Sequence, residues 1–269
     1  MVFLPRNTSN PILTIVLAEI WRAIRVSFRG FDAIIEVVSS VIFILGITLT
    51  IAVQNPSILR DPHGVSGISW GVIVFIMISD KLWILGHSLE REKRGKILEN
   101  ILATNTPIWI HILSQMPAAM IWTLASLAIA SLTVFPMLGV NPVPADPLIF
   151  IAGYVLSETM ASGIALTYSI AAMIMRRPWI ATNVLQFVLP VISGMIPYTY
   201  APQYLKEIMS VNPLSYPIEM LRRGATGINY MPIDPHLMII YSLVGITVIY
   251  IIAIALTNHI ARMLRRTSI

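Results

Sequence analysis

The sequence has no cysteine among its 269 residues. Disulfide bonds, thiolate nucleophiles and cysteine-based metal sites are therefore excluded. Charge is also scarce, because only 12% of the residues are Asp, Glu, Lys or Arg, about half the share in an average soluble domain. Hydrophobic residues make up 56% of the chain, and the mean hydropathy is +0.78. These values indicate an integral membrane protein.

Sequence motifs for catalysis are missing as well. The chain contains no G-x-x-x-x-G-K-[ST] phosphate loop and no H-E-x-x-H zinc motif. Its five histidines are scattered without metal-ligand spacing: His63, His87, His111, His236 and His259. We therefore expect no bound metal and no cofactor in this chain. The net charge of +5 is attributed to basic residues at a membrane face, which gives no reason to expect a nucleic-acid partner.

The sequence contains several long apolar runs. Runs of this length predict transmembrane helices, whereas a β-barrel has short alternating segments. The predicted fold is all-α, a single transmembrane domain over residues 1–269 with six spans. These are Ile34–Val53, Ile68–His87, Ile108–Phe135, Leu148–Met175, Trp179–Pro197 and Leu237–Asn258.

Lys and Arg residues predict the orientation. Thirteen of them fall at the two termini and in the second and fourth loops, whereas the opposite side holds four, Arg60, Lys206, Arg222 and Arg223. The positive-inside rule therefore places both termini in the cytoplasm.

Residues 11–30 resemble a signal peptide only at first sight. The apolar run Pro11–Ala18 is short, and Trp21, Arg22 and Arg25 follow where small cleavage-site residues are expected. Apolar residues recur instead at helical spacing, which predicts an amphipathic helix on the cytoplasmic membrane surface.

Seven of the 31 charged residues lie within Glu90–Glu99, between the second and third spans. After them, Ile97, Leu98, Ile101 and Leu102 form an apolar stripe, and Pro107 ends the segment. The segment 88–107 is either a solvated surface helix that contacts lipid headgroups or a helix that a cytoplasmic partner binds.

Residues 198–236, between the fifth and sixth spans, are broken by prolines into helix-like pieces at Pro202–Met209 and Ser215–Gly224. They form either a plain surface loop or short re-entrant helices on the external side, which satisfy their own backbone hydrogen bonds.

Two segments resemble a known family. Asn212–Gly227, NPLSYPIEMLRRGATG, resembles the signature before the last span of type-two ABC exporter permeases. Glu90–Pro107, EREKRGKILENILATNTP, resembles the cytoplasmic loop of that family, with acidic and basic residues and a glycine before an apolar helix. Both occur in the expected order within the expected topology, so the resemblance covers essentially the whole chain.

The resemblance implies a membrane subunit of an ATP-driven exporter in the plasma membrane of a prokaryote. Two permease copies, identical or not, form the pathway, and a separate ABC ATPase binds ATP and Mg²⁺. The residues expected to couple to that ATPase are Glu90, Glu92, Arg94, Gly95, Ile97, Leu98, Ile101 and Leu102. The external motif contributes Asn212, Pro213, Arg222, Arg223 and Gly224. The expected substrate is an amphipathic small molecule, a lipid or a lipid-linked glycan.

Polar residues within the spans complete the set of candidates. In the fifth span Thr182, Asn183, Gln186 and Ser193 either meet the substrate or second copy, as the resemblance implies, or form hydrogen bonds within one subunit. Glu36, Asp80, Lys81 and Glu158 are charges inside spans. We interpret them as structural, with Glu36 pairing Lys81. The alternative is an ion- or proton-coupled carrier that uses Asp80, Lys81 and Glu158.

Overall fold

The computed structural model describes residues 61–95 and 107–267 continuously, and before them positions 14, 17, 18, 20, 21, 25, 38, 41–47, 49, 50 and 53. Within these residues every regular element is a helix, as predicted. Most of the predicted interfacial helix, residues 11–30, lies outside the described residues.

Four of the six predicted spans are confirmed. Helices over Pro62–Arg94, Ile108–Met137, Pro147–Ile174 and Pro235–Ile260 are long and apolar enough to cross a membrane. The predicted fifth span is α10, Pro178–Ser193, whose 16 residues fall short of the roughly 20 that a span needs. Of the first predicted span, Ile34–Val53, the structure describes positions 38, 41–47, 49, 50 and 53, which are all helical, and the span as a whole stays a prediction.

Two predicted boundaries need correction. The second span begins earlier than predicted, with α4 (Pro62–Ile84) after the Asp61 N-cap, and the chain continues into a short charged helix, α5 (Ser88–Arg94). The third span consists of α7 (Ile108–Leu113) and α8 (Met116–Met137), because Pro117 in the first turn of α8 starts a new helix.

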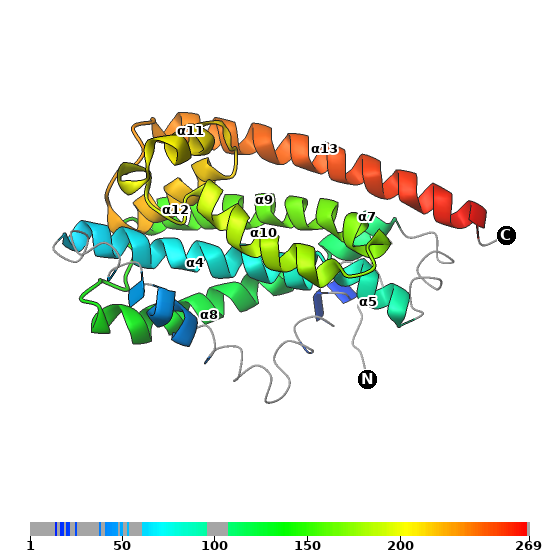
Figure 1. Ribbon diagram of the computed structural model, residues 1–269, viewed down its shortest axis with the longest axis horizontal. Coiled ribbons are helices and arrows are strands. Elements are labelled where there is room, and N and C mark those ends of the chain that lie inside the picture. The colour runs from blue at the N-terminus through cyan, green and yellow to red at the C-terminus, as the bar shows by residue number, and fades with distance from the viewer. Residues whose placement is uncertain are drawn as a thin grey trace.

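The helices form a bundle around α9 (Pro147–Ile174), which packs against α4, α12 (Ser215–Thr226) and α13 (Pro235–Thr267). Figure 1 shows α10 alongside α4, with α11 (Gln203–Val211) and α12 gathered at one end of the bundle. We call this end, where α4 and α9 begin, the α12 end. The other, with α5, α7 and the start of α10, is the α5 end (Figure 1). The two short helices predicted before the last span are thus present as α11 and α12.

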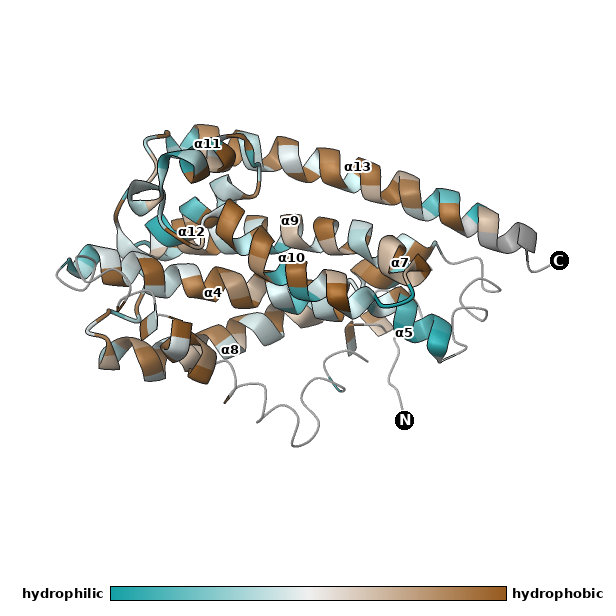
Figure 2. Ribbon diagram, in the orientation of Figure 1, coloured by the Kyte–Doolittle hydropathy of each residue, from teal (hydrophilic) through white to brown (hydrophobic). Residues whose placement is uncertain are grey.

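The apolar core lies between α4, α8 and α9. Trp70 of α4 makes edge contacts with Phe135 of α8 and Phe150 of α9, with ring centroids 4.9 and 5.4 Å apart. Figure 2 shows brown, hydrophobic ribbon along most of the long helices and teal, hydrophilic ribbon at α5. α5 is therefore a charged element at one end of a largely apolar bundle.

Candidate functional site

The α5 end carries the described part of the predicted coupling segment. α5 follows α4 after a turn in which the backbone N–H groups of Leu85 and Gly86 both donate to the carbonyl of Lys81, at 3.0 Å. Gly86 fits against Tyr168 of α9, and a Cβ here would approach the Leu82 carbonyl oxygen within 2.3 Å. The chain can therefore turn closely against α9, and Leu89 is buried there.

The Arg91 side chain of α5 hydrogen-bonds to the end of α4. Its guanidinium donates to the carbonyl oxygens of Trp83 at 3.1 Å and Ile84 at 2.7 Å. Carbonyls in the last turn of a helix have no partner within that helix, so a basic side chain there satisfies them and complements the helix dipole. α5 is consequently held to α4 by side-chain bonds as well as by the chain itself.

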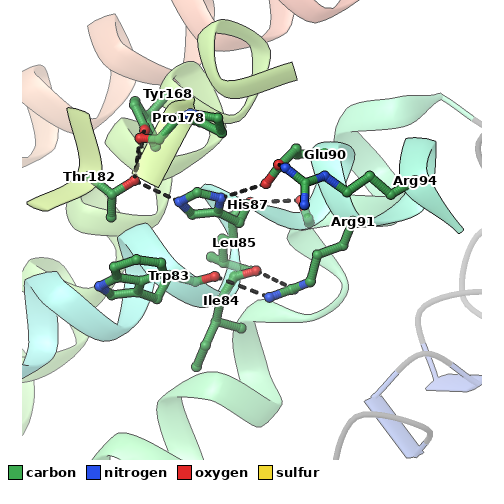
Figure 3. A network of polar contacts seen from close by, with 11 residues as sticks. Trp83, Ile84, Leu85, His87, Glu90, Arg91, Arg94, Tyr168, Pro178 and Thr182 are labelled. Atoms are coloured by element: carbon green, nitrogen blue, oxygen red, sulfur yellow. Dashed lines mark hydrogen bonds and ion pairs between the residues drawn. The ribbon is translucent and has the colours of Figure 1, made fainter. Parts of the chain in front are cut away.

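His87, the N-cap residue of α5, connects this helix to α10 (Figure 3). Its Nδ1 lies 2.8 Å from Glu90 Oε2, and its Nε2 lies 2.6 Å from Thr182 Oγ1. Thr182 Oγ1 is in turn 2.7 Å from the Tyr168 hydroxyl, which donates to the Pro178 carbonyl. One buried polar network therefore links α5, α9 and α10.

A second histidine binds α5 from the other side. His111 of α7 places its Nε2 2.5 Å from Glu92 Oε1. Glu90 also pairs with Arg94, whose side chain is 72% exposed. Glu90 and Glu92, both predicted for ATPase coupling, are thus bonded to histidines. The Arg94 side chain reaches back to Glu90 and stays largely exposed (Figure 3). Among the described residues no group of three His, Asp or Glu side chains could hold a metal ion.

Sequence reasoning assigned no partner to His87 or His111. The His87–Glu90 spacing of three residues was a local signal, since residues three apart meet on a helix face. The contact between His111 and Glu92 joins helices separated by residues 96–106, so no local pattern indicated it. The predicted coupling residues Ile97, Leu98, Ile101 and Leu102 lie outside the described residues.

The predicted polar residues of α10 bind other elements of the same chain. The Gln186 side-chain oxygen accepts from Ser79 at 3.0 Å and from the Trp83 indole at 2.9 Å, and its amide nitrogen donates to Asn183 at 3.0 Å. Ser193 accepts from Asn212 at 2.9 Å. These contacts and those of Thr182 lie within one subunit, and contact of the same residues with a substrate or a second copy stays a prediction. α10 also carries exposed apolar side chains: Trp179, Ile180, Val184, Phe187 and Val188.

The intramembrane charges meet in a pair that was not predicted. Lys81 Nζ lies 2.5 Å from Glu158 Oε2 and donates to Thr123 Oγ1 at 3.3 Å, and both charged side chains are fully buried. Glu36, the predicted partner of Lys81, lies outside the described residues. Asp80, next to Lys81 in α4, is only half-buried.

Helix geometry explains how Lys81 reaches Glu158. Trp70 packs against Phe150 and Gly86 against Tyr168, so Lys81 is level with the turn of α9 that follows Glu158. Side chains on a helix lean toward its N-terminus, and the long lysine spans one more turn. Position along each predicted span does not by itself indicate this contact.

The external motif forms the centre of the α12 end. Arg222 is fully buried and donates to the carbonyl oxygens of Gly67 at 3.1 Å and of Gly194, and to Glu219 at 2.5 Å. Gly194 follows the last turn of α10 with φ +108°, a conformation that favours glycine. Arg222 thus ties α12 to the start of α4 and to the end of α10.

The other residues of the external motif pack nearby. Asn212 donates to the Ile192 carbonyl at 3.1 Å and accepts from the Leu214 N–H at 3.1 Å. Pro213 contacts Gly245 of α13, while Arg223 is half-buried. Gly224 lies against the backbone of α9, and its carbonyl accepts from the Asp146 N–H at 2.8 Å. The motif therefore packs α12 and the residues just before it against four other helices, α4, α9, α10 and α13.

These features define a multi-pass helical membrane protein in which a charged helix at one end is bonded to the spans. The chain matches the family model of the ABC-2 type transporter over residues 11–225, and it therefore belongs to that family. The matched region is the membrane domain of such a transporter. This domain lacks the nucleotide-binding domain itself. No curated protein matches the sequence.

Proposed function

We propose that this chain forms, as a dimer, the translocation pathway of an ATP-driven exporter, and that a separate ABC ATPase binds the segment 88–107. ATP and Mg²⁺ then act in the partner subunit. Both termini and the α5 end face the cytoplasm, the α12 end faces outward, and the protein resides in a prokaryotic plasma membrane. The distribution of basic residues and the family membership support this assignment.

The observation that carries the proposal is the attachment of α5. This charged helix is bonded to α4 through Arg91, to α7 through Glu92, and to α10 through His87. Lys93 also donates to the Met173 carbonyl of α9 at 3.5 Å. A partner that displaces α5 therefore moves the ends of four helices together. A solvated surface loop needs none of these contacts.

The proposed substrate is an amphipathic small molecule, a lipid or a lipid-linked glycan. The exposed face of α10 is apolar, with Val184 56% exposed and Phe187 52% exposed. An apolar surface of this kind suits the hydrophobic part of such a molecule or the facing permease copy.

ATP hydrolysis tests the proposal. The purified chain alone is expected to hydrolyse no ATP, whereas a complex with its co-purifying ATPase does. Ile97→Asp or Leu98→Asp should prevent assembly with that ATPase, because an unpaired charge is costly in an apolar interface. The comparison is Lys93→Gln with Lys96→Gln, which should disturb assembly less, because these changes remove charges without placing an unpaired one in an apolar interface.

Two results contradict the proposal. Assembly of the Asp variants at the level of the unchanged chain means that the segment is a solvated face. Transport driven by a proton gradient without nucleotide supports the carrier alternative instead. The Lys81–Glu158 contact argues against that alternative, because each charge already neutralises the other inside the protein.

A further inference from the structure

Two aromatic side chains, Trp83 near the end of α4 and His87 just after it, hydrogen-bond to α10 at positions one helical turn apart. We call this pair of contacts the ring contact. Trp83 and His87 stack with centroids 5.0 Å apart and an angle of 9° between the ring planes. The Trp83 indole donates to Gln186 at 2.9 Å, and His87 bonds Thr182 at 2.6 Å. The stacked pair is therefore bonded to two successive turns of the same face of α10.

At its His87 end, the ring contact consists of buried polar groups whose hydrogen bonds are all made within the protein. Thr182 has no exposed surface, and its hydroxyl meets His87 Nε2, the Tyr168 hydroxyl and the Pro178 carbonyl. Hydrogen bonds in such a dry environment are costly to leave unmade. His87 and Thr182 are thus expected to stay bonded when the helices move.

The ring contact is also bonded directly to α5, the described part of the predicted coupling segment. His87 is the N-cap of α5 and binds Glu90 in its first turn, while Arg91 binds the carbonyl of Trp83 itself. Displacing α5 therefore displaces both rings. On the side of α10 away from this contact, Val184 and Val188 are about half exposed, so packing within the described chain does not hold α10 in place there.

We infer that the hydrogen bonds from His87 to Thr182 and from Trp83 to Gln186 transmit the displacement of α5 to α10, which makes Thr182 a positioning residue for coupling. This inference rests on the proposed function and adds the specific contacts that carry the movement. We assign the transmission to these contacts because α5 packs mainly against α9, whereas His87 bonds α10 directly.

The absence of native cysteine makes a direct test practical. A bimane fluorophore on a single cysteine at Val184 of α10 reports the surroundings of that helix. The complex with the co-purifying ATPase is measured without nucleotide and after trapping with ATP, Mg²⁺ and vanadate. With Thr182 unchanged, trapping should shift the bimane emission.

Thr182→Val removes only the hydroxyl and keeps the side-chain shape. We expect the variant to retain the ATPase on size-exclusion chromatography but to lose most of the emission shift, because the hydroxyl that bonds His87 is absent. Thr182→Ser should restore the shift. The matched control is Thr257→Val, because Thr257 is equally buried but bonds only carbonyls of its own helix, α13.

The possible outcomes distinguish failure of this inference from failure of the proposed function. A full emission shift in Thr182→Val overturns the inference while the proposed function stands. Loss of the ATPase together with the shift overturns it too, because Thr182 then supports docking rather than transmission. If Thr182→Val does not fold, Gln186→Leu at a half-buried position tests the second contact in the same way. If the protein with unchanged Thr182 binds no ATPase, the proposed function is contradicted instead.

Discussion

Lys81 and Glu158 place opposite charges in the fully buried interior of the bundle. Removing one partner leaves the other charge buried alone, so Lys81→Met or Glu158→Gln should each lower the free energy of unfolding by about 3–5 kcal/mol. Replacing both by Met should cost much less, since apolar residues of similar volume often substitute for a buried pair. Thermal unfolding in detergent, followed by tryptophan fluorescence, measures this.

The matched control for the charge pair is Glu207→Gln, because Glu207 is exposed on α11. It should leave the unfolding midpoint nearly unchanged. A double variant as unstable as the sum of the two single variants contradicts the pairing.

Asp61 and Tyr200 form a pH-sensitive contact at the α12 end. The Tyr200 hydroxyl donates to Asp61 and holds the pKa of this carboxyl below its ordinary value of 3.8. Burial, and then Asp61 itself, raises the pKa of Tyr200 to about 12. The contribution of Asp61 to stability is therefore complete above pH 3.8 and is lost as the pH falls through its lowered pKa.

Tyr200→Phe tests this contact. The variant should melt at a lower temperature than the unchanged protein at pH 7, and the difference should shrink once the pH falls below the pKa of Asp61. Melting curves across the acidic range measure the effect, with Tyr204→Phe as control, since Tyr204 is 68% exposed. A difference that does not depend on pH would contradict the assigned role.

At the scale of elements, glycines allow α9 and α12 to pack backbone to backbone. A Cβ at Gly224 would lie 2.2 Å from the backbone nitrogen of Phe150, and one at Gly153 would lie 2.3 Å from that of Leu221. Backbone cannot move aside as a flexible side chain can. Gly224→Ala should therefore destabilise the protein by about 1–3 kcal/mol or more, as overpacking does.

The control for this packing is Gly46→Ala. Gly46 is helical and has nothing within 4 Å of a Cβ, so alanine should be neutral or stabilising there. Thermal unfolding of the two variants in the same detergent makes the comparison. Equal midpoints for Gly224→Ala and the unchanged protein would show that the helices are not in this close contact.

At the scale of the whole molecule, the orientation in the membrane is the property to test. Single cysteines at Lys93 and Lys206 lie at the α5 end and the α12 end respectively. In intact cells a membrane-impermeant thiol reagent should label the cysteine at 206 and not that at 93. Permeabilised cells, in which both are labelled, provide the control, and the reverse pattern in intact cells contradicts the proposed orientation.

The sequence determined the class of the protein by itself. Long apolar runs require helices in a membrane, because backbone groups there must be satisfied within each segment. Proline and glycine positions indicated α11 and α12, and the charges of residues 90–99 marked α5. Each of these signals is local, and each needs no knowledge of neighbouring helices. The length of α10 was misjudged because apolar residues continue past Gly194, where the helix ends.

Only the tertiary structure decided which polar groups meet. Lys81 binds Glu158, His87 binds Thr182 and Arg222 binds carbonyls of α4 and of the turn after α10, all across large separations in sequence. Such pairs depend on the relative height and rotation of packed helices. Those are set by close contacts such as Gly153 against Leu221 and Gly86 against Tyr168, which no periodic pattern in one helix can specify.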